Sequence, residues 1–168
     1  MKLTLFSTLA VTMMGNVHAL EVGDTFCVEG FVMDRFCIEQ GFLLDAPEVV
    51  TLMNPELHSF HCLLDVGVCV GSAFELLSDP TGDEDFGRGF ELSEATKTAA
   101  VALGKEIGSC EECVNGNDDT KLAMGFRAVL VGSVESIASD VPDGQPTMIL
   151  AHDQIAAANG VDLSLIHI

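Results

Sequence analysis

The 168-residue chain contains no tryptophan and no tyrosine, and only seven lysines and arginines stand against 26 aspartates and glutamates. The missing rings argue against a carbohydrate-binding surface, which stacks large aromatic side chains on sugars. The net charge of −19 excludes nucleic acid and anionic membranes as natural partners, because a polyanion repels both. A metal ion or a basic extracellular protein would suit this charge, although a solvated acidic surface explains it more simply.

The chain also lacks an apolar run long enough to cross a bilayer, which takes about 20 residues. Its N-terminus combines Lys2, a mostly apolar stretch Leu3–Met14 and small residues ending at Ala19, the pattern of a secretory signal peptide. We therefore expect residues 1–19 to be removed and residues 20–168 to form one secreted domain, periplasmic if the source is bacterial. Because the removed segment holds Lys2 and no acid, the mature charge becomes −19 − 1 = −20.

No enzyme signature is present, since G-x-S-x-G, H-E-x-x-H and the phosphate-binding loop are all absent. The pair His152-Asp153 has no nucleophile near it in the sequence. Two acidic loops, residues 79–85 and 115–119, do not fit the EF-hand pattern, so turn chemistry explains them as well as loose calcium binding. The chain is more simply interpreted as a non-enzyme.

The six cysteines all follow the expected cleavage site. An even number of cysteines in an exported chain predicts up to three disulfides, and the sequence does not choose among the 15 pairings. The candidates are Cys27, Cys37, Cys62, Cys69, Cys110 and Cys113. Cys110 and Cys113 form a C-x-x-C, which elsewhere can be a redox centre. The two glutamates between them disfavour a reactive thiolate, so a disulfide within the loop is the simpler interpretation.

The stretch Pro55–Gly71 concentrates the remaining chemistry. His58, His61 and Cys62 follow one another within five residues, and imidazole and thiolate are preferred ligands of zinc and copper. Asp34, just after the first expected strand, can add an oxygen. These four residues predict a zinc or copper site, with a purely structural role as the alternative, because Cys62 is also a disulfide candidate.

A helix is expected in the same stretch, with Asn54 as its N-cap and Pro55 in its first turn. The apolar residues recur at helical spacing and predict a core face of Leu57, Phe60, Leu64 and Val68. An adjacent stripe holds His58, Cys62, Asp65 and Cys69.

Other segments predict a small β-rich domain. The expected strands are Phe26–Met33, Ala73–Leu77, Ala123–Ile137, Met148–Ala151 and Val161–Ile168. The other expected helices are Pro47–Met53 and the segment that Ser93 caps, with Ala95, Ala99, Leu103 and Ile107 at four-residue intervals. Gly30, inside the first strand, predicts a bulge or a close backbone approach.

The fold class that follows is α+β and β-rich: a small OB-like barrel or curved sheet of five or six strands, with one or two inserted helices and disulfides. We expect the strands Phe26–Met33 and Ala123–Ile137 to be central and close in space.

The motif Gly30-x-Val32-x-Asp34-x-x-Cys37, followed by a His/Cys segment and a Val-Gly-x-Val strand, resembles a group of small exported bacterial proteins. The resemblance covers roughly two-thirds of the mature chain and implies an OB-like barrel without an established activity. The chain departs from that group in two ways. Its second cysteine follows Cys62 by seven residues rather than four, and the loop with Cys110 and Cys113 is an addition.

Three functions are consistent with these observations. The first is a secreted, disulfide-stabilised module that holds a transition metal or a metal-containing ligand at Asp34, His58, His61 and Cys62. The second is a structural or protein-interaction domain without small-molecule chemistry. The third is a thiol–disulfide oxidoreductase that uses Cys110 and Cys113.

Overall fold

The computed structural model describes residues 21–82, 84–108, 123–138 and 147–157, and for 138 and 147–157 it describes the backbone alone. The expected signal peptide, Cys110 and Cys113, the last strand Val161–Ile168, and the side chains of His152 and Asp153 therefore lie outside the described part.

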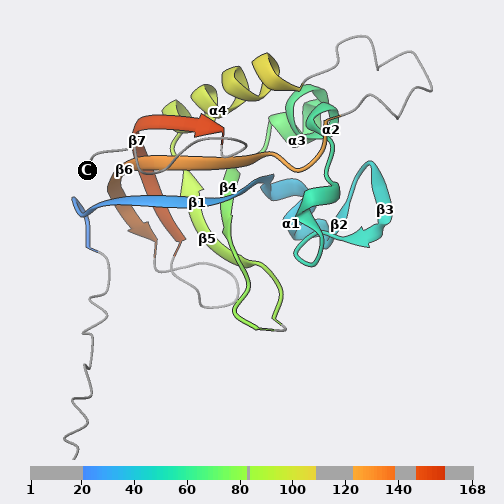
Figure 1. Cartoon of the computed structure of the whole chain (residues 1–168), viewed down its shortest axis with the longest axis horizontal. Coiled ribbons are helices and arrows are strands. Elements are labelled where there is room, and N and C mark those ends of the chain that lie inside the picture. The colour runs from blue at the N-terminus through green and yellow to red at the C-terminus, as the bar shows by residue number, and fades with distance from the viewer. Residues whose placement is uncertain (1–20, 83, 109–122, 139–146, 158–168) are drawn as a thin grey trace, which may run out of the picture.

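Five strands form a curled sheet whose hydrogen-bonded order closes on itself (Figure 1). They are β1 (Thr25–Asp34), β4 (Phe74–Ser78), β5 (Gly87–Leu92), β7 (Thr147–Ala157) and β6 (Arg127–Ala138), in that order around the barrel. All neighbours are antiparallel except β5 and β7. The predicted α+β, β-rich class is confirmed. The first strand and the long strand near the C-terminus, which were expected to lie close in space, do so: they pair from Thr25 opposite Ser133 to Phe31 opposite Arg127.

Gly30 confirms the close approach expected inside the first strand. β1 leaves its pairing with β6 near this residue and pairs with β4 from Phe31 onward. A Cβ atom at Gly30 would lie 2.0 Å from the carbonyl oxygen of Leu77, a distance that no side chain tolerates. Only glycine therefore lets β4 cross β1 this closely.

The main core lies inside the barrel and beneath the helix α4 (Glu94–Ile107). Ser93 caps this helix as predicted, by accepting a hydrogen bond from the backbone N–H of Thr96 at 3.2 Å. The buried stripe of the helix is Thr96, Ala100 and Gly104, shifted by one residue from the expected alanine stripe. The shift has a steric cause, because a Cβ at Gly104 would lie 2.6 Å from Leu64, so only glycine allows α4 to pack so closely there.

The long connection between β1 and β4 forms a second layer at one end of the barrel (Figure 1). It contains α1 (Arg35–Gln40), β2 (Phe42–Leu43), β3 (Ala46–Val50), η1 (Pro55–Leu57), α2 (Phe60–Asp65) and α3 (Gly67–Val70). Its own small core consists of Met33, Cys37, Ile38, Leu43, Cys62, Cys69 and Leu77. Three of these seven side chains are cysteines.

Two expected helices in this connection are wrong. The segment Pro47–Met53 is not helical, because Val49 and Val50 extend β3, which pairs with β2 as a two-stranded sheet. The stretch from Pro55 is three short helical pieces rather than one helix. Ser59 adopts an extended conformation and starts a new helix by capping Cys62, and the chain breaks again at Val66. As a result Leu57 is 41 % exposed and Val68 52 % exposed, so neither belongs to the expected core face.

Strand β5 was not among the strands expected from the sequence. Its residues Gly87–Leu92 alternate poorly, with glycine at positions 87 and 89. The strand forms because β4 offers it a hydrogen-bonding edge, from Glu75 opposite Glu91 to Ser78 opposite Gly87.

The expected disulfides are not observed among the four described cysteines, whose sulfurs are all free. Cys62 Sγ and Cys69 Sγ lie 3.5 Å apart, well beyond the roughly 2.05 Å of an S–S bond. In the described part of the chain, no helix is both long enough and apolar enough to span a bilayer.

Candidate metal centre

Six side chains that are distant in sequence converge in the second layer. We call them the Asp/Cys/His cluster: Asp34, Cys37, Asp45, His58, Cys62 and Cys69. Five of the six are at most 2 % exposed, and only Asp45 reaches the surface, with 25 % of its side chain exposed. Buried ionisable groups are costly unless they are paired or bound to a metal, so this concentration requires an explanation.

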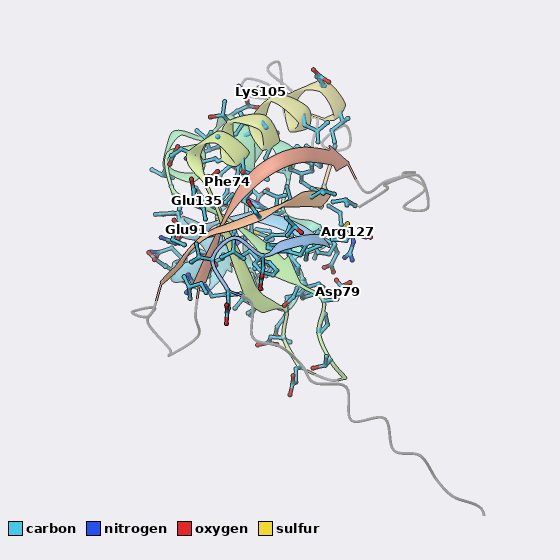
Figure 2. All side chains as sticks on the ribbon, turned by 90° about the vertical axis from the view of Figure 1, so that its left-hand side faces the viewer. Phe74, Asp79, Glu91, Lys105, Arg127 and Glu135 are labelled. Atoms are coloured by element: carbon cyan, nitrogen blue, oxygen red, sulfur yellow. The ribbon has the colours of Figure 1, made fainter. Side chains whose placement is uncertain are left out.

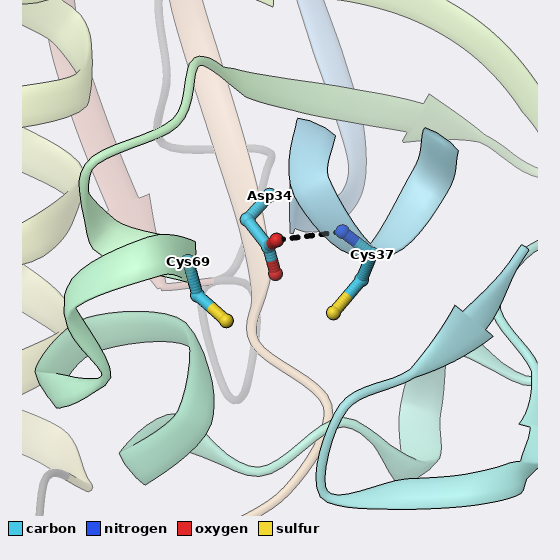
Figure 3. A group of neighbouring side chains, drawn as sticks. All are labelled: Asp34, Cys37 and Cys69. Atoms are coloured by element: carbon cyan, nitrogen blue, oxygen red, sulfur yellow. Dashed lines mark hydrogen bonds between the residues drawn. The ribbon is translucent and has the colours of Figure 1, made fainter. Parts of the chain in front are cut away.

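The sulfur-rich half of the cluster joins the end of β1 to α3. The ligand atoms of Asp34, Cys37 and Cys69 all lie within 4.8 Å of one another, and Figure 3 shows both sulfurs beside the carboxylate. Asp34 is the N-cap of α1 and accepts a hydrogen bond from the Cys37 N–H at 2.8 Å. This cap places carboxylate and thiol on the same side of the strand-to-helix junction. Cys62 adds a third sulfur, 3.5 Å from Cys69.

The other half is built around His58, at the end of η1. Its Nε2 lies 2.9 Å from Asp34 Oδ2 and its Nδ1 lies 3.2 Å from Asp45 Oδ1. Asp45 also accepts a hydrogen bond from the Ser59 N–H at 2.9 Å, which fixes its carboxylate. The ligand atoms of Asp45, His58 and Cys62 again lie within 4.8 Å of one another.

The electrostatics of the imidazole follow from its two neighbours. Burial disfavours the imidazolium, but the hydrogen bonds and charges of Asp34 and Asp45 outweigh it and raise the pKa of His58 to about 9. Burial likewise acts to raise the pKa of Asp45, yet His58 and Ser59 lower it to about 2. Without a metal, both ring nitrogens of His58 therefore donate to carboxylates.

Hydrogen bonds among the three thiols of the cluster change their pKa values. Hydrogen bonds from Cys62 and Cys69 lower the pKa of Cys37. Each of these two bonds raises the pKa of the other cysteine in it, Cys62 or Cys69. Hydrogen bonds from neighbouring thiols thus stabilise a thiolate at Cys37, and the thiolate is the form that binds metals.

The structure brings together three of the four residues expected at a metal site. Asp34, His58 and Cys62 are all in the cluster. His61 points elsewhere: its Nδ1 lies 3.3 Å from Asp65, which also contacts Lys105 at 3.5 Å.

Sequence reasoning missed three members of the cluster as metal ligands. Cys37 and Cys69 were named only as disulfide candidates, and Asp45 was not singled out. The spacing of Asp34 and Cys37, three residues apart across a strand-to-helix junction, was a usable signal. Nothing in the sequence placed Asp45 opposite His58, because that contact depends on the β2–β3 pairing.

No family model matches the chain, and no curated protein or solved structure is significantly similar to it. The inference about function therefore rests on the geometry of the cluster.

Proposed function

We propose that this protein is an exported module that binds a thiophilic transition metal, zinc or copper, in the Asp/Cys/His cluster. The ligands of the principal ion are Cys37, Cys62, Cys69 and Asp34, which we call the inner site. The observation that carries the proposal is that two buried thiols, Cys37 and Cys69, lie beside the buried Asp34 carboxylate. A third buried thiol, Cys62, lies 3.5 Å from Cys69.

The sulfur spacing supports such an ion. A tetrahedral zinc centre with Zn–S bonds of about 2.3 Å separates its sulfurs by about 3.8 Å. The Cys62 and Cys69 sulfurs are 3.5 Å apart, close to that spacing and far from a disulfide. The donor set is also selective, because soft thiolates favour zinc or copper(I) over magnesium and calcium.

Burial supports a structural ion rather than a catalytic one. A catalytic zinc keeps a coordination position open to water or substrate, whereas a structural zinc is closed by protein ligands. All four inner ligands are at most 2 % exposed. They come from β1, α1, α2 and α3, so the ion would hold together the layer whose own apolar core is small.

The proposal also includes an OB-like fold for the barrel and export of the protein from the cytoplasm. The barrel order β1-β4-β5-β7-β6, with α4 between its third and fourth strands in the chain, agrees with the five-stranded OB arrangement. The cluster lies in the connection between the first two barrel strands, which OB folds often use for ligands. The signal-like N-terminus supports delivery outside the cytoplasm.

Metal and thiol analysis of the same sample tests the proposal. The untagged protein, reduced with a phosphine without oxygen, would be loaded with Zn²⁺, desalted and assayed for metal and for free thiols. We expect bound zinc in the wild type and its loss in Cys37→Ser and Cys69→Ser. Cys27→Ser is the matched control, because Cys27 is an exposed cysteine of β1 outside the cluster. A folded wild type that retains neither zinc nor, after the same loading with Cu(I), copper would exclude the proposal.

A metal-free, disulfide-stapled interaction domain is the second candidate. It is favoured by the 3.5 Å approach of Cys62 and Cys69, which a small movement could convert into a disulfide. The same assay separates the two functions, because protein isolated without reductant would then lack the Cys62 and Cys69 thiols and bind no zinc after loading.

A further inference from the structure

We propose that the cluster holds a second metal ion, at an outer site formed by Asp45, His58 and Cys62. This inference rests on the proposed function, because Cys62 also belongs to the inner site and its thiolate would bridge the two ions. The ligand class is a divalent ion of borderline softness, with zinc as the probe.

The contact between His58 and Asp45 has the spacing of two ligands on one ion. With Zn–N and Zn–O bonds of about 2.1 Å, neighbouring ligand atoms of a tetrahedral site lie about 3.4 Å apart. His58 Nδ1 and Asp45 Oδ1 are 3.2 Å apart. An ion could therefore replace the proton between them with little rearrangement, and the proton would leave to solvent.

The opposite ring nitrogen of His58 is already arranged as in metal sites. A ligating histidine almost always donates its second N–H to a carboxylate or carbonyl, which fixes the orientation of the ring. His58 Nε2 does this toward Asp34 at 2.9 Å, and both residues are at most 2 % exposed. Nδ1 is thus directed at Asp45 and the outer site.

The two sites differ in access to solvent. The inner ligands are at most 2 % exposed, whereas Asp45 of the outer site is 25 % exposed. The outer ion should therefore exchange first and the inner ion should remain longer.

Zinc stoichiometry under chelator competition tests the inference. We expect about two zinc ions on the reduced wild-type chain, with one removed readily by a chelator and one retained. Asp45→Asn and His58→Gln should each bind about one ion, which resists the chelator. Asn keeps an oxygen acceptor for the Ser59 N–H, and Gln keeps an N–H donor for Asp34, so both variants should fold.

The neighbouring pair His61 and Asp65 supplies the controls. Its Nδ1–Oδ2 distance of 3.3 Å resembles that of His58 and Asp45, but it lies outside the cluster. His61→Gln and Asp65→Asn should keep both ions. One tightly held ion in the wild type, unchanged in Asp45→Asn, would overturn the second site and leave the proposed function intact. No ion at all would overturn both.

Discussion

Arg127 shows how individual side chains secure the barrel on its outer surface. It donates to Glu29 of β1 at 2.6 Å and forms two hydrogen bonds with Asp79, just after β4 (Figure 2). Its guanidinium also lies 5.0 Å from the Phe31 ring centroid. One residue of β6 therefore contacts β1 and the end of β4, which border each other in the barrel.

The Asp79–Arg127 pair should make stability depend on pH. The hydrogen bond from Arg127 lowers the pKa of Asp79 below its ordinary 3.8. Its stabilising contribution is thus fully present above that value and is lost as the pH falls through the lowered pKa. Because Asp79 is 55 % exposed, we expect Asp79→Asn to cost only about 0.5 kcal/mol near neutral pH.

Urea unfolding of both proteins at about pH 6 and about pH 2.5 measures this effect. The difference between wild type and Asp79→Asn should shrink at the lower pH. Asp85→Asn, an exposed acid of the same loop, is the control and should show no such change. A difference that stays constant with pH would contradict the interpretation.

At the residue scale, the sequence predicted which side chains could bind a metal better than it predicted which side chains they contact. Asp34, His58 and Cys62 were identifiable because of their types and their spacing. Cys37 and Cys69 were predicted to form disulfides, because that is the default for cysteines in an exported chain. Only the three-dimensional structure shows that both lie beside Asp34. Asp45 could not be found, since a loop aspartate has no periodicity.

At the scale of elements, the glycine in β1 decides how the barrel closes. Gly30→Ala places a methyl group against the Leu77 carbonyl oxygen, and we expect a loss of about 3 kcal/mol in the free energy of unfolding. Gly67→Ala is the matched control. It lies in α3 with no atom within 4 Å of its added Cβ, so it should be neutral or stabilise by about 0.5 kcal/mol.

Chemical denaturation of the two glycine variants measures the difference. Equal stabilities for Gly30→Ala and Gly67→Ala would show that the β1–β4 crossing can relax and would contradict this account of the crossing.

Elements with long periodic patterns were predictable, and short ones were not. β1, β6 and α4 were found because their apolar runs or caps are unambiguous. The segment of β3 was predicted as part of a helix, Pro47–Met53, whereas its pairing with β2 decides its conformation. The expected helix from Pro55 grouped His58, Cys62 and Cys69 correctly, but it is the breaks at His58 and Val66 that let them converge.

The proposed metal ion should stabilise the second layer more than the barrel. The backbone N–H groups of two cluster cysteines donate to helix N-caps: Cys37 to Asp34 at 2.8 Å and Cys62 to Ser59 at 3.0 Å. On removal of zinc by a chelator, we expect hydrogen exchange at α1, α2 and α3 to accelerate about tenfold, equivalent to about 1.4 kcal/mol. Amides paired between β1 and β6 should change little. Uniform acceleration across both layers would contradict a local role for the ion.

For the molecule as a whole, the barrel is a scaffold and the inserted layer contains the Asp/Cys/His cluster. Three of the seven buried residues in the core of that layer are cysteines. A metal ion bound to them, as proposed, would add its binding free energy directly to the stability of the folded state.

The most direct test of the central claim is X-ray absorption at the zinc edge, on the reduced chain loaded with one equivalent of Zn²⁺. The buried inner site should fill first, so the spectrum should show mainly sulfur neighbours at about 2.3 Å, with a minor oxygen contribution. Cys27→Ser should give the same spectrum. A first shell of nitrogen and oxygen alone, at about 2.0–2.1 Å, would contradict the three-thiolate site.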